Sequence, residues 1–254
     1  MIGFFYSTLV TVAPMFAIII NLVLMEYFLK FSTLGYAQRE LFSCTILYTF
    51  IFSLLTASPF NAVLSRYISD VIYEERYQDI LPCYHIGMML NIVLSCLVGI
   101  PFCLWEHFVG GVSVAYVFAG FWCYISLVFV FYSMIYLSIC KDYQRIAQYY
   151  IVGMLVAFFL SLFLRYICHW GITQSMLAAM DAGFFLTAVL ENALVKRYFR
   201  KNSNRYKPVL SYFKKYWQLV VTNFLYILGL YVHNFVFWTT DMRMVVVDSF
   251  VCNQ

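Results

Sequence analysis

The chain has 254 residues, of which 64% are hydrophobic and only 11% are charged, and its net charge is +4. Soluble domains carry about 25% charged residues, so this composition excludes an ordinary soluble fold and indicates a membrane protein. The sequence contains no P-loop, no G-x-S-x-G nucleophile motif and no H-E-x-x-H zinc motif. We therefore expect no enzymatic activity, no cofactor, no metal site and no nucleic-acid partner.

Seven apolar segments are each long enough to cross a membrane as a helix, which takes roughly 20 residues. Their continuous apolar character excludes the alternating pattern of barrel strands. The predicted fold class is therefore all-α, a polytopic transmembrane helix bundle. The segments are residues 2–29, 41–65, 82–105, 112–140, 147–169, 172–195 and 216–238.

Proline interrupts the first three segments, at Pro14, Pro59 and Pro101. A proline inside a helix cannot donate a backbone hydrogen bond, and it frees the carbonyl four residues earlier. In the second segment this carbonyl belongs to Leu55, and the proline is flanked by polar side chains that include Asn61. Pro59 and Asn61 are predicted either to line a polar cavity between broken helices, as in transporters, or to form a purely structural kink.

Two pairs of charged residues are predicted to be structural. Arg66 and Asp70 are four residues apart at the end of the second segment, so they share one face of a helix. Glu26 and Arg165 lie near the corresponding ends of the first and fifth segments. Because their predicted depths are similar, we expect them to pair across the two helices.

The sixth segment contains two acidic residues at different depths. Asp181 lies near its middle, where an ionised carboxylate costs at least about 2.5 kcal/mol and must face protein or water. It is predicted to be either a proton, cation or substrate site, or a neutral acid that a hydrogen bond holds in a helix interface. Glu191 lies closer to the end of the segment, and we expect its side chain to reach the solvated membrane surface.

The eight cysteines are scattered, mostly within the apolar segments, without C-x-x-C spacing. Free cysteine behaves as a small apolar side chain in such surroundings. We therefore expect buried thiols rather than disulfides or a metal site.

Eight of the sixteen lysines and arginines fall between Lys196 and Lys215, in a stretch without acidic residues. Basic loops are retained on the cytoplasmic side of a membrane, so this stretch is predicted to be cytoplasmic. Six segments precede it, which places the amino terminus on the same side. Such a stretch is also suited to bind acidic membrane lipids.

The seventh segment contains the run GLYVHNFVFW (229–238), in which His233 and Asn234 introduce polar groups into an apolar helix. A second motif, PFNAVLSRYISDVIYEERYQDILPC (59–83), follows the proline of the second segment. Together these motifs resemble the Pel exopolysaccharide transporter family, PelG. The resemblance extends across nearly the whole chain, although the third to sixth segments match mostly in hydropathy.

The resemblance implies an inner-membrane or plasma-membrane protein related to polysaccharide flippases of the multidrug/oligosaccharidyl-lipid/polysaccharide exporter superfamily, which have two six-helix lobes. Residues 1–195 would form the first lobe and 196–215 a basic cytoplasmic linker. Residues 216–254 would start the second lobe with one helix and a loop, so the chain is expected to be an amino-terminal portion. The implied cargo is a biofilm-matrix polysaccharide. The implied partners are a cytoplasmic glycosyltransferase and other membrane subunits of a synthase complex.

Under this interpretation, the candidate residues of the substrate pathway or of ion coupling should face the space between the lobes. They are Asp181, His233, Asn234, Asn61 and Pro59. Two alternatives remain open. The protein would be an ion-coupled flippase of lipid-linked oligosaccharides or small molecules, or a membrane scaffold that anchors a polysaccharide synthase and transports nothing.

Overall fold

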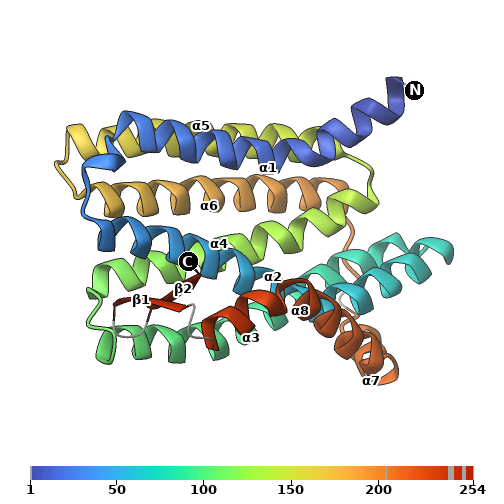
Figure 1. Cartoon of the computed structure of the whole chain (residues 1–254). Coiled ribbons are helices and arrows are strands. Elements are labelled where there is room, and N and C mark those ends of the chain that lie inside the picture. The colour runs from blue at the N-terminus through green and yellow to red at the C-terminus, as the bar shows by residue number, and fades with distance from the viewer. Residues whose placement is uncertain (1, 204, 240–242, 248–249, 254) are drawn as a thin grey trace.

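The computed structural model describes the backbone of residues 2–203, 205–239, 243–247 and 250–253, and the side chains of residues 15–203, 205–237 and 239. It is a bundle of long helices with one short β-hairpin (Figure 1). The long helices are α1 (Ile2–Phe28), α2 (Tyr36–Tyr73), α3 (Ile80–Phe108), α4 (Val114–Ile139), α5 (Tyr143–Tyr166), α6 (Ile172–Tyr198) and α8 (Trp217–Thr239). The shorter elements are the 3-10 turns η1 (Phe31–Thr33) and η2 (Tyr77–Asp79), helix α7 (Lys207–Lys215), and strands β1 (Arg243–Val247) and β2 (Phe250–Asn253).

Every expected apolar segment corresponds to one long helix, and the all-α fold class is confirmed. Within the described residues, six helices are long and apolar enough to cross a membrane, namely α2 to α6 and α8. The first expected segment is α1, whose described side chains cover the apolar stretch Met15–Phe28. Two features differ from expectation: α7 lies within the basic stretch, and an antiparallel hairpin of β1 and β2 replaces part of the expected terminal loop.

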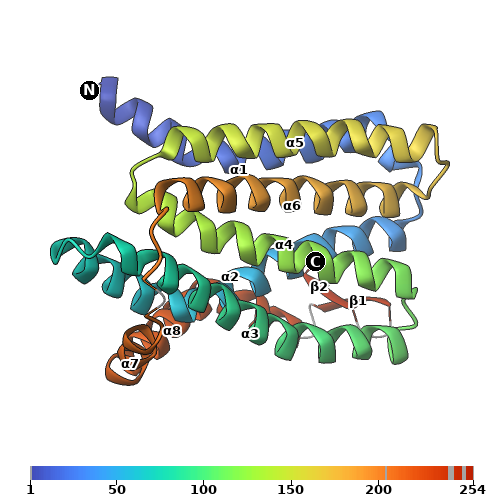
Figure 2. The same ribbon diagram turned by 180° about the vertical axis from the view of Figure 1, so that it is seen from behind.

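Consecutive long helices run in opposite directions (Figures 1 and 2). Helices α1 and α5 pack side by side on one flank, α6 and α4 fill the middle, and α2 and α3 complete the other flank, where α8 packs against α2. We call one end of the bundle the basic end, because it contains the α2–α3 turn, the α4–α5 turn and residues 199–215. The α1–α2, α3–α4 and α5–α6 connections lie at the opposite end.

Helices α5 and α6 approach each other most closely at two glycines. A Cβ atom on Gly153 would lie 2.6 Å from the carbonyl oxygen of Gly183, and a Cβ atom on Gly183 would lie 2.7 Å from that of Gly153. Thr187 Oγ1 donates a hydrogen bond to the carbonyl of Gly183 at 2.9 Å. In lipid, close packing of small residues is a main source of helix association, so this contact fixes α5 against α6.

Toward the basic end, the core contains a set of fully or almost fully buried tyrosines, which we call the tyrosine cluster: Tyr84, Tyr132, Tyr136 and Tyr150. Tyr132 donates its hydroxyl proton to the carbonyl of Tyr84 at 2.8 Å, and its hydroxyl lies 2.9 Å from that of Tyr136. Gly87 leaves room for this arrangement, because a Cβ atom there would lie 2.1 Å from the Tyr132 hydroxyl oxygen. The cluster therefore satisfies its buried hydroxyls within the bundle, as an apolar surrounding requires.

The prediction of buried free thiols is confirmed at some positions and wrong at two. Cys83 and Cys123 are buried free thiols. Cys96, Cys103 and Cys140 are free and partly buried, and Cys168 is free and exposed. Cys44, however, is disulfide-bonded, which the scattered spacing of the cysteines did not indicate.

The glycine contact between α5 and α6 gives a test of the packing. We expect Gly153→Ala to destabilise the bundle by about 1–3 kcal/mol, because the added methyl group overlaps the backbone of Gly183 and must push the helices apart. Gly35→Ala is the matched control, since nothing lies within 4 Å of a Cβ atom at that position. Thermal unfolding in detergent measures both variants. Equal stability of the two variants would contradict the close contact.

Candidate functional site

The proline of α2 lies in the region on which α8 packs. The hydroxyl of Ser58 donates to the carbonyl of Leu55 at 3.3 Å, and so replaces the hydrogen bond that Pro59 cannot donate. The carbonyl of Ser58 in turn accepts a hydrogen bond from Nδ2 of Asn223 in α8. The polar groups at this proline are thus shared between α2 and α8.

Asn61, two residues after Pro59 in α2, is partly buried. Its side-chain oxygen Oδ1 is buried and has no hydrogen-bond partner among the described residues. Such a group is costly unless something donates to it. The region of Pro59 and Asn61 therefore combines a replaced backbone hydrogen bond within a continuous helix with one open acceptor.

His233 and Asn234 lie in the second half of α8. Asn234 is 7% exposed, and its amide Nδ2 lies 3.0 Å from Nε2 of His233, which is itself exposed. The next residue, Phe235, contacts the ring of Phe52 in α2 with centroids 6.2 Å apart. This part of α8 is therefore also held against α2.

Asp181 lies at a different helix interface. The Ser126 hydroxyl of α4 donates to its Oδ1 at 2.9 Å, and the carboxyl group is partly buried between α6 and α4. Cys123 lies one turn before Ser126 in α4, close enough to Asp181 to interact with its carboxyl group electrostatically. The structure thus does not bring the candidate pathway residues together. Asp181 lies between α4 and α6, whereas Pro59 and Asn61 lie in α2 near its contact with α8, and in α8 Asn234 is buried while His233 is exposed.

The structure forms one of the two expected charged pairs. Arg66 Nε and Asp70 Oδ2 lie 3.6 Å apart on one face of α2. Glu26 and Arg165 do not pair within the described part of the chain, so that prediction is wrong. Arg165 instead donates to the carbonyl of Trp170 at 2.9 Å, because the last carbonyls of a helix and the residues after it lack backbone partners.

A cavity of about 230 Å³ lies between α2, α3 and α4 toward the opposite end. Its walls are largely apolar and aromatic, with a few polar groups that include Thr45, Tyr116 and the buried Glu106. The Tyr116 hydroxyl donates to Thr45 Oγ1 at 3.1 Å. Sequence analysis did not predict this cavity, because its walls come from three helices whose relative rotation is not encoded in any local pattern.

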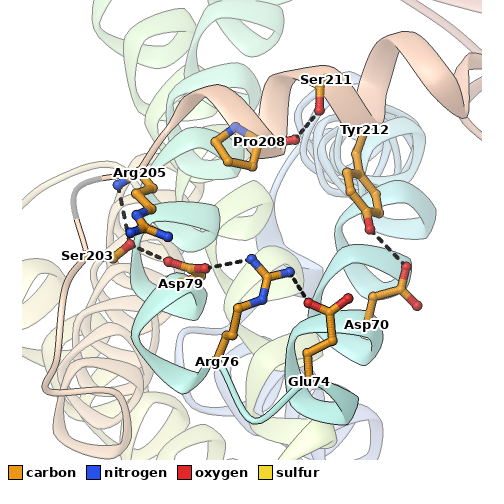
Figure 3. Close-up of polar contacts among 9 residues, drawn as sticks. All are labelled: Asp70, Glu74, Arg76, Asp79, Ser203, Arg205, Pro208, Ser211 and Tyr212. Atoms are coloured by element: carbon orange, nitrogen blue, oxygen red, sulfur yellow. Dashed lines mark hydrogen bonds and ion pairs between the residues drawn. The ribbon is translucent and has the colours of Figure 1, made fainter.

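At the basic end, charged and polar side chains attach residues 199–215 to the α2–α3 turn (Figure 3). Arg76 pairs with Glu74 at 2.5 Å and with Asp79 at 3.1 Å. Asp79 is only 1% exposed and also accepts a hydrogen bond from the hydroxyl of Ser203. The backbone N–H of Ser203 donates to the carbonyl of Gln78 at 3.0 Å. We call these contacts the linker clamp.

Helix α7 continues the attachment begun by the linker clamp. Val209 is fully buried, and the ring of Tyr212 packs edge-on against Tyr67 of α2 with centroids 4.9 Å apart. The Tyr212 hydroxyl donates to Asp70 at 3.1 Å (Figure 3). Partial burial and this hydrogen bond raise the pKa of Tyr212. Asp70 therefore pairs with Arg66 in its own helix and accepts a hydrogen bond from Tyr212 in α7. The contact with Tyr212 was not predicted.

Glu191 is the largest departure from expectation. It is 0% exposed rather than solvated. Helix α6 extends to Tyr198, and the tyrosine cluster covers the face on which Glu191 lies. The helix continues seven residues beyond Glu191, about one turn more than expected, and its side chain is turned toward the core.

The linker clamp yields a prediction with a matched control. Asp79→Ala removes the acceptor of both Arg76 and Ser203, a loss of about 1.5–3 kcal/mol for hydrogen bonds to a charged group. We expect trypsin to cut the variant several-fold faster after Arg200, Lys201 or Arg205. Glu74→Ala should leave the rate unchanged, because the Glu74 side chain is 51% exposed and such pairs contribute at most about 1 kcal/mol. Equal rates for the two variants would show that Asp79 does not hold the segment.

The family model described as "PelG: Putative exopolysaccharide Exporter (EPS-E)" matches residues 1–254, which is the whole chain. The comparisons with curated proteins and with solved structures gave no match. A family match of this extent agrees with the apolar helices and with the two motifs at 59–83 and 229–238. The chain belongs to the PelG family of exopolysaccharide exporters.

Proposed function

We propose that the protein exports a biofilm-matrix exopolysaccharide across the cytoplasmic membrane through a flippase-like pathway that alternates its access. The observation that carries this proposal is the family match over the whole chain, together with the six helices of its described part that are long and apolar enough to span a membrane. In this proposal, the first six long helices form one lobe, residues 196–215 form the linker and α8 begins the second lobe.

The contact between α2 and α8 supports the alternating-access part of the proposal. Helix α8 packs mainly against α2 and leaves much of its apolar surface uncovered. It meets α2 at the proline, where Asn223 donates to the carbonyl of Ser58. Broken helices and polar groups at the interface of two repeats are the usual location of transporter pathways. We therefore propose that the two lobes meet at Pro59 and that this contact changes when access alternates.

The wall chemistry of the cavity between α2, α3 and α4 also suits a carbohydrate. Sugars offer hydroxyl groups and flat ring faces, which aromatic side chains with a polar atom can stack on and bind. Tyr48, Tyr116 and Tyr124 line this cavity together with Thr45 and Thr49. We propose that this cavity is one part of the polymer path.

Charge supports the proposed orientation, with the amino terminus and residues 196–215 in the cytoplasm. The basic end carries a surface pocket of about 560 Å³ whose lining includes Arg145, Arg197, Arg200 and Lys201. Exposed Lys214 and Lys215 at the end of α7 add to this charge. We propose that this surface meets acidic lipid headgroups and the cytoplasmic glycosyltransferase that supplies the polymer, within a complex containing other membrane subunits.

The orientation can be tested by labelling. We expect a cysteine introduced as Lys201→Cys to resist a membrane-impermeant thiol reagent in intact cells and to react after the membrane is opened, because residue 201 is exposed and lies in the basic segment. Cys168 is exposed and lies at the opposite end of the bundle, so it should react in intact cells. The reverse pattern would overturn the proposed topology.

The pathway role of Asp181 gives a second test, in cells that contain the full-length protein and an intact synthase. We expect Asp181→Leu to lower polymer secretion several-fold, because it leaves Ser126 without its acceptor and removes the polar group. Asp181→Asn keeps the shape and the hydrogen bond. Normal secretion by the asparagine variant indicates a neutral role, and loss in both variants indicates a titrating or substrate-binding carboxylate, as in an ion-coupled flippase. Normal secretion by the leucine variant would remove Asp181 from the pathway.

A further inference from the structure

Glu191 is a buried carboxyl group without a structural explanation in the contacts around it. Its side chain is 0% exposed, and both carboxyl oxygens lack a hydrogen-bond partner among the described residues. It lies seven residues before Tyr198, the last residue of α6, or about 10 Å along the helix axis. Glu191 is therefore inside the bundle, in the half nearer the basic end.

The groups that face Glu191 are hydroxyls rather than cations. Tyr150 of α5 and Tyr84 of α3 lie within electrostatic range of it. The tyrosine cluster also includes Tyr132 and Tyr136 of α4, and the hydroxyl of Tyr136 lies 3.6 Å from the thiol of Cys83. The nearest basic residue along α6 is Lys196, which is exposed and interacts with His85. None of these groups neutralises a buried carboxylate.

Two other acids of the bundle show what a structural role requires. The buried Asp79 accepts from Arg76 and Ser203, and the partly buried Asp181 accepts from Ser126. Among the described residues, Glu191 has no corresponding donor. An ionised carboxylate in this position would pay the full desolvation cost, and such a group neutralises instead.

We propose that Glu191 is a proton-binding site of the exporter, and that the proton it holds sets the packing of α3 and α5 against α4. The step is the binding or release of one proton at a carboxyl oxygen, and no other covalent bond forms or breaks. A metal cation is less suited, because cations such as Ca²⁺ require about six oxygen ligands and the described side chains contain no group of three candidate metal ligands.

The neighbouring hydroxyls explain how the proton would change the packing. The Tyr150 hydroxyl now donates to the sulfur of Met134 at 3.3 Å, and the Tyr84 hydroxyl lies 3.1 Å from that of Ser133. Both Met134 and Ser133 belong to α4. When Glu191 loses its proton, the carboxylate needs hydrogen-bond donors. The hydroxyls of Tyr150 and Tyr84 interact with it electrostatically and can supply them. Their rotation toward Glu191 would break both contacts with α4, and so would loosen α3 and α5 from it. Helices α3 and α5 would thus pack tightly against α4 when Glu191 is protonated and loosely when it is ionised. Such a choice between two arrangements, made by one proton, is a switch.

The coupling of this proton to transport rests on the proposed export function, but the site itself can be measured without transport. Infrared difference spectra of the full-length protein in liposomes, recorded between acidic and alkaline buffers, report protonated carboxyl groups. We expect a carboxyl band that disappears at alkaline pH in the wild type and is missing in Glu191→Gln, which preserves the shape of the protonated acid. Asp181→Asn is the control and should keep this band.

Two results would overturn the proton site. One is a band that persists unchanged in Glu191→Gln, and the other is a band that responds to sodium at constant pH, which would indicate cation binding. If Glu191→Gln fails to fold, Tyr150→Phe provides the same test, because it removes a neighbouring hydroxyl and should shift the pH at which the band disappears. No shift in that variant would count against the site.

Polymer secretion then tests the coupling. We expect secretion to depend on external pH in the wild type and to lose that dependence in Glu191→Gln. An unchanged pH dependence in the variant would overturn the coupling. Failure of the export function itself would differ from both results, because the wild-type protein would export nothing while the carboxyl band still titrated.

Discussion

The dominant physical constraint on this molecule is that polar groups inside a bilayer have no water to bond and must find partners within the protein. Helix α2 shows the consequence most clearly. Pro59 leaves the carbonyl of Leu55 without its backbone donor, and Ser58 supplies a hydroxyl in its place. The carbonyl of Ser58 then takes its donor from Asn223 of α8. Helix α2 continues through Pro59, and its packing against α8 includes a polar contact beside that proline.

Water is accessible at the basic end, yet a similar constraint acts there through Asp79. This carboxylate is almost fully buried, so it needs donors, and it takes them from Arg76 in its own turn and from Ser203 more than a hundred residues later. Ser203 precedes α7, whose Tyr212 donates to Asp70 of α2. The path of the chain from α6 to α8 is therefore fixed by two carboxylate acceptors on the α2–α3 side of the bundle, the buried Asp79 and the partly buried Asp70. A movement of α8 relative to the other helices would therefore be transmitted through the contacts of Asp79 and Asp70.

The sequence predicts where a residue lies along its helix better than it predicts which way the residue faces. Position along a helix is recorded in an unbroken apolar run, so the predicted bounds lie close to those of the long helices except α2, which extends beyond its apolar run at both ends. Rotation about the helix axis is not recorded, because these helices are apolar on all sides. Glu26 and Arg165 were placed at matching depths but do not pair, and Glu191 was placed near a helix end but faces the tyrosine cluster. The docking of α7 was missed because nine residues give too short a pattern.

The central claim is that this family member carries a polysaccharide through the membrane rather than only anchoring its synthase. Inverted membrane vesicles containing the full-length protein and the synthase, supplied with sugar nucleotide outside, test it most directly. The account predicts that newly made polymer enters the vesicle lumen and is protected from an added glycosidase until detergent is present. Polymer made at the normal rate but fully digested without detergent would contradict transport and would leave the scaffold role as the explanation.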